Sequence, residues 1–162
     1  MKKKLTTAEI HRAARHAETM VADALLSLKR KGVLEFERIP DSKTAGVGNG
    51  GRYLPGRRSD FDAMCRGRYA LIEVKNSLVR SNFKGMNIAK TFRPSQLSAA
   101  HRWKAQGAVT IALFHGVDGW LHLPTWLIAE WQIKGLKSIP EEGFSIPKWG
   151  LSETIERILT DT

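Results

Sequence analysis

Apolar residues near the start of the chain recur at helical spacing. They fall three or four positions apart for most of the stretch, at Ala14, Ala17, Val21, Ala24, Leu25 and Leu28. Thr6 and Glu9 have the spacing of a capping box, in which each side chain binds the backbone N–H of the other residue. Gly32 favours a helix end just before it. The pattern therefore predicts one amphipathic helix between Thr6 and Gly32.

The next segment, from Val33 to Ile39, alternates with the period of a strand. Leu34 and Phe36 point one way, the two glutamates between and after them point the other way, and Pro40 ends the run. We predict a half-buried strand here.

A second alternating stretch runs from Ser59 to Asn76 and contains a turn signal at Arg66-Gly67. If these two residues form the loop of a hairpin, residue 65 pairs with 68 and 64 pairs with 69. Each strand then has an apolar side, made by Phe61, Ala63 and Cys65 in the first and by Ala70, Ile72 and Val74 in the second. The pattern predicts a hairpin with one face in the core.

The remaining elements follow from turn residues and apolar runs. We predict a helix from Pro94 to Gln106, a central strand from Ala108 to His115, a turn at Asp118-Gly119 and a strand from Trp120 to Leu123. The next predicted helix runs from Pro124 to about Lys134, with Trp126, Leu127 and Trp131 in the core. An irregular tail from Gly135 to Gly150 and a short last helix capped by Ser152 complete the chain. Residues 77–92 give no clear pattern. The order of elements predicts an α/β fold with a mixed β-sheet flanked by helices.

Composition agrees with one domain. The 162 residues are 42% hydrophobic, enough for a single core, and no internal repeat is present. We assign residues 1–162 to one domain and predict a flexible, basic, glycine-rich loop at about 41–58.

The net charge changes the picture of what the chain binds. Lys and Arg number 26 against 16 Asp and Glu, a net charge of +10, which favours a polyanionic partner such as DNA. Candidate DNA-binding residues lie in the glycine-rich loop and after the hairpin: Lys43, Arg52, Arg57, Arg58, Lys84, Lys90 and Arg93. A surface loop without a binding role is the alternative for the first four.

The hairpin also carries the candidate chemistry. The predicted register places Asp60 opposite Glu73, and Lys75 lies two residues further on the same face. Carboxylates facing each other at about 5 Å repel, so a shared divalent cation and the lysine ammonium are the simplest means to hold them there. An ordinary hairpin that shows its charges to water is the alternative, and we favour the site.

Glu18 is a third candidate carboxylate. It lies three residues before Val21 and seven before Leu25, on the stripe of the first helix that is expected to face the core. Asp23 lies on the side expected to face solvent. A buried carboxylate is costly unless it is paired or binds a metal. Metal binding and outward snorkelling at the edge of the stripe are equally consistent with this position.

Such a set suits hydrolysis of a phosphodiester. Mg²⁺, with Mn²⁺ as a substitute, prefers hard oxygen ligands, here Asp60, Glu73 and the carbonyl of Val74, with Glu18 completing the cluster if its helix packs nearby. The cation activates water and neutralises developing charge. Lys75 orients that water or stabilises the charge, and acting as a general base would require a strongly depressed pKa.

The spacing of Asp60, Glu73 and Lys75 resembles the PD-(D/E)xK nuclease motif, and the wider likeness is to Holliday junction resolvases of the RecU type, including phage-encoded forms. It covers most of the chain: the helix with Glu18, the D-F-D to E-V-K block, the stretch from Asn87 to Gln96, and W-L-H-L-P at residues 120–124. The resemblance implies a restriction-endonuclease-like fold, a homodimer, magnesium dependence and paired nicks across a four-way DNA junction. It also implies metal-site roles for the three carboxylates, a catalytic role for Lys75 and a helper role for Gln96.

Three positions depart from that family. Ser59 replaces the motif proline, Ser95 replaces a histidine expected before Gln96, and the basic segment from Lys43 to Arg58 is shorter and richer in glycine. A repair-type or restriction-type nuclease of the same fold, and a non-catalytic DNA-binding protein, therefore stay open as alternatives.

Other classes are disfavoured. Cys65 is the one cysteine, which excludes an internal disulfide and a cysteine zinc cluster, and the five histidines have no zinc-ligand spacing. No apolar segment follows the lysines at the start of the chain as in a signal peptide, and no run is long enough to span a membrane. We expect a cytoplasmic protein of a bacterial or phage-infected cell.

Overall fold

The computed structural model describes residues 5–39, 59–148 and 150–161. Its centre is a six-stranded sheet in the order β1-β2-β3-β4-β5-β6. The strands are β1 (Leu34–Arg38), β2 (Phe61–Cys65), β3 (Arg68–Asn76), β4 (Val109–Gly116), β5 (Gly119–Pro124) and β6 (Phe144–Ile146). Neighbouring strands are antiparallel except β3 and β4, which are parallel. The predicted α/β class with a mixed sheet is confirmed.

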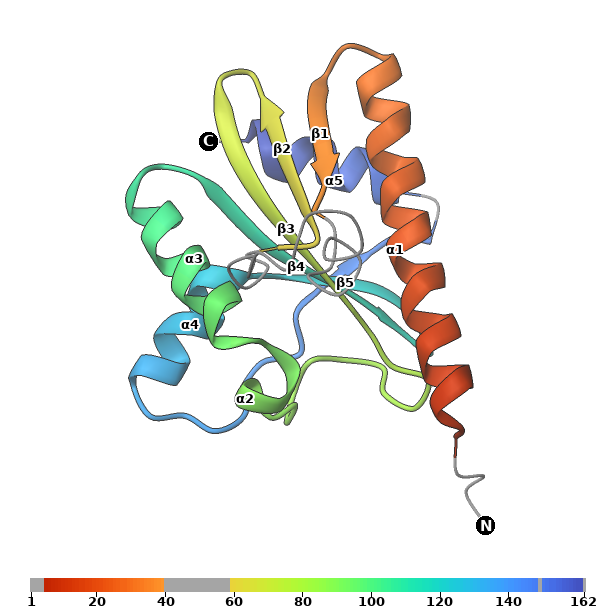
Figure 1. Cartoon of the computed structure of the whole chain (residues 1–162), viewed down its shortest axis with the longest axis vertical. Coiled ribbons are helices and arrows are strands. Elements are labelled where there is room, and N and C mark those ends of the chain that lie inside the picture. The colour runs from red at the N-terminus through yellow and green to blue at the C-terminus, as the bar shows by residue number, and fades with distance from the viewer. Residues whose placement is uncertain (1–4, 40–58, 149, 162) are drawn as a thin grey trace, which may run out of the picture.

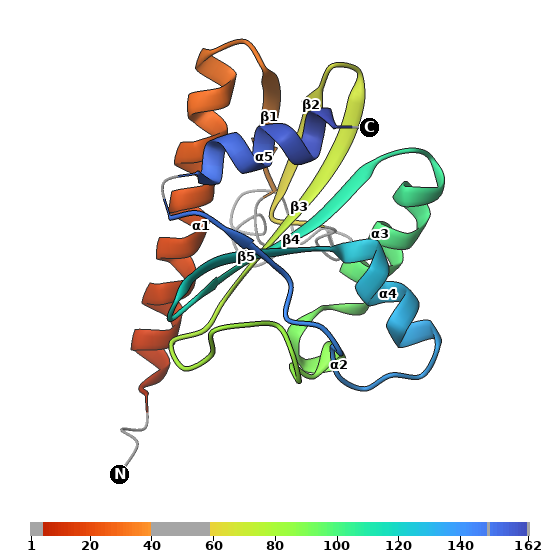
Figure 2. The same ribbon diagram turned by 180° about the vertical axis from the view of Figure 1, so that it is seen from behind.

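Helices cover both faces of this sheet (Figures 1 and 2). One face packs on α1 (Thr7–Arg30) and α5 (Leu151–Thr160), and the other packs on α2 (Ile88–Thr91), α3 (Pro94–Ala105) and α4 (Thr125–Ile133). No helix in the described ranges combines the length and apolarity needed to cross a bilayer.

The first face holds the apolar rows that the sequence predicts. Ala17, Val21, Leu25 and Leu28 of α1 are fully buried, and they share a cluster with Phe61, Ala63, Ala70, Ile72 and Val74 of the hairpin. The capping box at Thr6 and Glu9 is present. Because these five apolar residues point to α1, the alternate positions of the hairpin, which include Asp62, Glu73 and Lys75, point to the face that α2–α4 cover.

Three strands of the sequence prediction, β1, β4 and β5, and three helices, α1, α3 and α4, hold within one or two residues. The helix predicted from Pro94 runs to Ala105, and Gly107, with φ at +83°, follows its end. The central strand β4 is buried on both faces between β3 and β5. Its neighbour β5 follows a turn closed by the pair Gly116 and Gly119.

Other expectations are corrected. The tail from Gly135 to Gly150 contains β6, which pairs with β5, and residues 77–92 contain α2 with Phe83, Ile88 and Phe92 buried around it. Gly150, and not Ser152, is the N-cap residue of α5. Periodicity failed at these places because three-residue strands and single-turn helices are too short to show it.

The core of α4 also differs from the prediction. Trp131 is buried as expected, but Trp126 and Leu127 are half-buried, and Ile128 and Ala129 are the residues that reach the core. Apolar residues are spread around most of this helix, so its sequence does not show which face is inside.

Candidate active site

The hairpin of β2 and β3 has the predicted register. Five pairs are formed, from Cys65 with Arg68 at the turn to Phe61 with Ile72. The two turn residues, Arg66 and Gly67, both have positive φ, at 49° and 78°. This backbone matches the twist of paired strands, which explains how a non-standard Arg-Gly turn fixes the register.

Regular pairing ends one residue before the predicted pair of Asp60 with Glu73. The N–H of Asp60 donates to the carbonyl of Ile72 at 3.0 Å, so the chain departs from the ladder here. Its carboxylate turns to the backbone of β3, where Oδ2 accepts a 2.6 Å bond from the N–H of Val74. The carboxylate of Asp60 is thus held beside the peptide that joins Glu73 to Val74, and the side chain is only 5% exposed.

Glu73 is the most buried carboxylate of the candidate set, at 3% exposure. Two donors bind the same oxygen, Oε1: the ammonium of Lys75 at 2.5 Å and the side-chain amide of Gln96 at 2.5 Å. Hydrogen bonds to a charged group are stronger than neutral ones, and the ammonium balances the buried charge. The structure therefore brings Gln96, which is distant in the sequence, to the pair formed by Glu73 and Lys75.

Gln96 reaches Glu73 because of its place in α3. Pro94 opens this helix, and Gln96 stands at the third position, where a glutamine side chain reaches back to the N-cap residue. Its Oε1 accepts a 2.9 Å bond from the N–H of Arg93, which leaves the amide NH₂ directed at Glu73. The side chain is 4% exposed, so the start of α3 fixes both of its ends.

Lys75 has a second neighbour that the sequence did not indicate. Its Nζ lies 5.0 Å from the centre of the Phe92 ring, and the ring is fully buried at the end of α2. A cation over an aromatic face is attracted by the ring quadrupole. Phe92 and Glu73 together hold the ammonium in one place.

Glu18 lies apart from these residues. It forms an ion pair with Arg38 at the end of β1, and α1 packs on the face of the sheet opposite to the one that Glu73 and Lys75 occupy. Within the described ranges, no group of three or more His, Cys, Asp or Glu side chains is placed to hold a metal ion. The predicted cluster of three carboxylates is not assembled in this structure.

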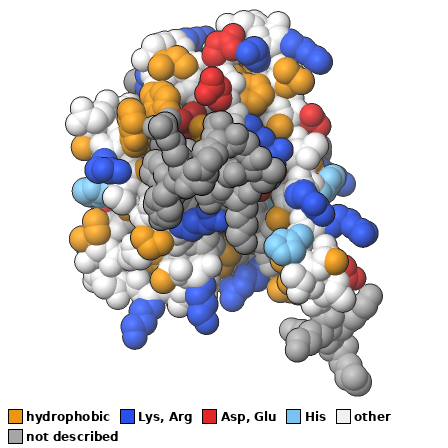
Figure 3. Space-filling view, viewed as in Figure 1, with side chains coloured by type: hydrophobic (Ala, Val, Ile, Leu, Met, Phe, Trp, Pro, Cys, Tyr) orange, Lys and Arg blue, Asp and Glu red, His pale blue; other side chains and the backbone are white. Residues whose placement is uncertain are grey.

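The candidate DNA-binding residues divide into two groups. Lys84, Lys90 and Arg93 are exposed; Lys90 lies in α2, and Arg93 is the N-cap residue of α3. Figure 3 shows Lys and Arg side chains along the lower edge of this face, in the region where α2 lies in Figure 1. Lys43, Arg52, Arg57 and Arg58 lie outside the described residues, as does the whole predicted loop at 41–58.

Sequence reasoning missed Asp62. This carboxylate is 7% exposed and accepts hydrogen bonds from the hydroxyls of Ser59, at 2.5 Å, and of Tyr69. The Tyr69 ring in turn lies 4.8 Å from the ring of Trp103 in α3. Asp62 thereby links Ser59 to Tyr69 of β3. In the sequence, only its place on the polar face of the hairpin indicated a role for Asp62.

No family model and no curated protein matches this chain. Among solved structures, the Holliday junction resolvase Hjc of the archaeal hyperthermophile Archaeoglobus fulgidus matches with a TM-score of 0.42 and 16% sequence identity. The match covers 84% of this chain and 92% of that chain. At this level of similarity the functional interpretation depends on the residues of the site itself.

Proposed function

We propose that the protein is a metal-dependent, structure-selective DNA endonuclease that hydrolyses phosphodiesters and resolves four-way junctions by paired nicks. The observation that carries this proposal is the arrangement around Glu73. A buried carboxylate is bound by Lys75 and Gln96, and a second carboxylate, Asp60, is held beside the same peptide. Burying two carboxylates is costly, so a functional role explains their presence better than stability does.

The donor set fits a small, hard cation. Mg²⁺ is commonly bound by one or two protein carboxylates and otherwise by water and substrate phosphates, so a third carboxylate is not required. Asp60, Glu73 and the carbonyl of Val74 would hold Mg²⁺ or Mn²⁺. When bound, such an ion lowers the pKa of a water molecule and neutralises charge on the reacting phosphate.

The protein residues would position the reaction. Gln96, bonded at both ends, keeps the carboxylate of Glu73 in one orientation. Lys75, held by Glu73 and the Phe92 ring, places a positive charge at the edge of the site, where it would orient water or stabilise charge on the phosphate. Glu18 would contribute to metal binding only if its ion pair with Arg38 were broken.

Binding of DNA would be electrostatic in large part. The net charge of +10 supports a polyanionic substrate, and the exposed cations Lys90 and Arg93 lie next to the helix that contacts Glu73. Symmetric nicks in a four-way junction need two active sites, so we also propose that the protein acts as a homodimer.

The test is cleavage of a labelled synthetic four-way junction beside a linear duplex of matched sequence, with Mg²⁺, with Mn²⁺ or with a chelator. Asp60→Asn and Glu73→Gln should each abolish cutting while the protein stays folded, because an amide oxygen can still accept the hydrogen bonds described above. Asp23→Asn is the matched control, since this exposed aspartate lies on the outer side of α1.

Each outcome decides between the functions. Paired nicks confined to the junction and to the divalent-ion lanes establish a junction resolvase. Cutting of the duplex as well establishes a nuclease without junction selectivity. Tight DNA binding with no cutting under any divalent ion indicates a non-catalytic DNA-binding protein and overturns the proposal.

The contribution of the basic surface is tested separately by the salt dependence of binding. Replacing Lys90 and Arg93 by Ala should make the slope of log K against log salt shallower by about 2, one for each phosphate contact. Arg157→Ala on α5, which packs on the opposite face, is the control. An unchanged slope would remove this surface from the interface.

A further inference from the structure

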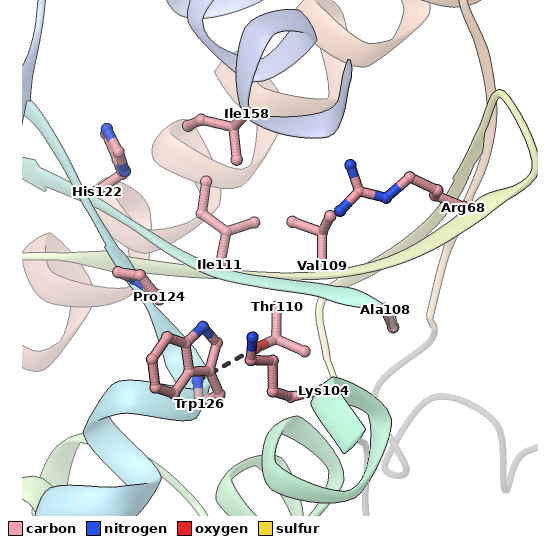
Figure 4. Close-up of a pocket in the computed structure, with 10 residues that line it drawn as sticks. All are labelled: Arg68, Lys104, Ala108, Val109, Thr110, Ile111, His122, Pro124, Trp126 and Ile158. Atoms are coloured by element: carbon pink, nitrogen blue, oxygen red, sulfur yellow. Dashed lines mark hydrogen bonds between the residues drawn. The ribbon is translucent and has the colours of Figure 1, made fainter. Parts of the chain in front are cut away.

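A cavity of about 230 Å³ opens at the end of the sheet where β3 and β4 begin (Figure 4). It exists because pairing of β5 with β4 ends at Ile111 and Pro124, and the chain then enters α4 at Thr125. The first two residues of β4 therefore lie beyond the reach of β5, and the first turn of α4 is tied to them by a 3.1 Å bond from the N–H of Trp126 to the Thr110 hydroxyl.

This cavity is separate from the carboxylates. Arg68, one of its lining residues, opens β3, and Glu73 lies five positions further along the same strand. At about 3.3 Å per residue, these two backbone positions are about 16 Å apart. At its other end the lining reaches Ile111, which pairs with Ile72. Neither Glu73 nor the side chains that bind it line the cavity, so its lining is a different set of residues.

The charge of the lining is of one sign. Arg68 and Lys104 are basic, and none of the residues that line the cavity is Asp or Glu. The Arg68 guanidinium donates to the carbonyl of Asp161 at 3.2 Å and, with five N–H donors, has the capacity to bind an anion as well. His122 adds a neutral donor and acceptor at pH 7, because burial lowers the pKa of its imidazole.

The rest of the lining is apolar and aromatic. Val109, Ile111 and Ile158 lie together on the same side of the β4 ribbon as Arg68, and Trp126 lies with Lys104 on the other side (Figure 4). The ammonium of Lys104 is 4.7 Å from the centre of the Trp126 ring, a cation–π contact that places a charge and an aromatic surface side by side.

These features select one class of ligand. An inorganic anion would use the two cations and gain nothing from the indole and the aliphatic side chains, whereas a purely apolar ligand would leave the cations without an anion. A nucleotide has both parts: an aromatic base, which stacks on aromatic side chains in DNA-binding proteins, and an anionic phosphate. A cavity of about 230 Å³ has room for one nucleotide and is too small for a duplex.

We propose that this cavity binds a single unpaired nucleotide of the DNA substrate, with the base against Trp126 and the phosphate at the ammonium of Lys104, which lies on the same side of the β4 ribbon. The inference rests on the proposed function, because it assigns the nucleotide to DNA that the site at Glu73 would cut. It gives a physical reason for preference toward branched DNA, in which unpaired nucleotides are available.

The first experiment measures binding of small probes to the full chain by tryptophan fluorescence or calorimetry at low salt. The probes are deoxyadenosine monophosphate, deoxyadenosine and inorganic phosphate. We expect the monophosphate to bind at least tenfold more tightly than either fragment. Lys104→Glu should weaken that binding at least tenfold, and Lys31→Glu, the same charge change at an exposed position after α1, should not.

Trp126→Leu supplies a second variant, and thermal unfolding of each variant shows that the fold is kept. Equal affinity for phosphate and for the monophosphate would reduce the cavity to an anion site and overturn the proposal. The absence of saturable binding of the monophosphate, or an equal effect of Lys104→Glu and Lys31→Glu, would overturn it as well.

The second experiment identifies the source of the nucleotide. A duplex with one unpaired adenine is compared with the same duplex fully paired, and we expect wild type to prefer the first and Lys104→Glu to lose that preference. Equal binding of the two duplexes by a protein that binds the monophosphate would overturn the assignment to DNA. Cleavage of DNA without binding of the monophosphate would support the nuclease function and overturn the proposed nucleotide site. Binding of the monophosphate without cleavage would support the nucleotide site and overturn the nuclease function.

Discussion

The contact between Lys75 and Glu73 gives a prediction about stability as well as activity. Replacing Lys75 by Met removes the positive charge next to a carboxylate whose side chain is 4% exposed, while Met keeps much of the packing against Phe92. Loss of one partner of a fully buried pair costs about 3–5 kcal/mol, and exposed pairs contribute about 1 kcal/mol or less. The Lys75 side chain is 18% exposed and Gln96 still binds Glu73, so we expect a loss of about 2–3 kcal/mol.

Thermal unfolding in the presence of a chelator measures this loss. For a chain of this length, 1 kcal/mol changes Tm by about 2–4 °C, so Lys75→Met should lower Tm by about 4–12 °C. Glu73→Gln alone should have a smaller effect, because it removes the buried charge and leaves Lys75 near solvent.

The double variant Lys75→Met with Glu73→Gln is the decisive control. The destabilisation of the Lys75 variant comes from a buried charge without its cation, and that charge is absent in the double variant. We therefore expect the double variant to be more stable than the sum of the single effects predicts, by about 1–3 kcal/mol. Additive effects, or a Tm of Lys75→Met equal to that of wild type, would refute the electrostatic account of this pair.

Three further predictions concern stability. Burial lowers the pKa of both His115 and His122. Below about pH 6.5 the unfolded chain therefore binds more protons than the folded chain. The free energy of unfolding should be highest above that pH and should decline as the pH falls below it. Urea unfolding at pH 7.5 and 5.5 measures this, and His115→Gln should weaken the dependence. Gly116→Ala should cost about 1–3 kcal/mol, since its Cβ would lie 2.6 Å from a backbone carbonyl oxygen of the loop after β3. Tyr69→Phe should cost about 1.5–3 kcal/mol by removing a hydrogen bond to the buried Asp62 carboxylate, and a Tm equal to that of wild type would contradict this.

Local patterns predicted much of the fold because they depend on contacts near in sequence. The helix after Thr6, its capping box and its end before Gly32 follow from spacing and backbone preference. The register of the hairpin follows from a two-residue turn at Arg66 and Gly67, since a hairpin joined by a tight turn leaves little freedom for slippage.

Short or irregular elements could not be predicted in the same way. The strand Phe144–Ile146 forms because β5 offers an edge to pair with, and the turn Ile88–Thr91 forms because Ile88 and Phe92 have a core to enter. Neither has enough residues to show a period, so both depend on partners distant in the chain.

The sequence by itself determined which residues carry the candidate chemistry. The spacing of Asp60, Glu73 and Lys75 along two paired strands restricts where these side chains can lie, because side chains on a strand alternate between its two faces. Tertiary structure decided the environment of those residues. It buried Glu73 and brought Gln96 from the start of α3 to its carboxylate, and it placed Glu18 with Arg38 on the other side of the sheet. Burial and the approach of separate helices depend on how the whole chain packs, and no local pattern contains that information.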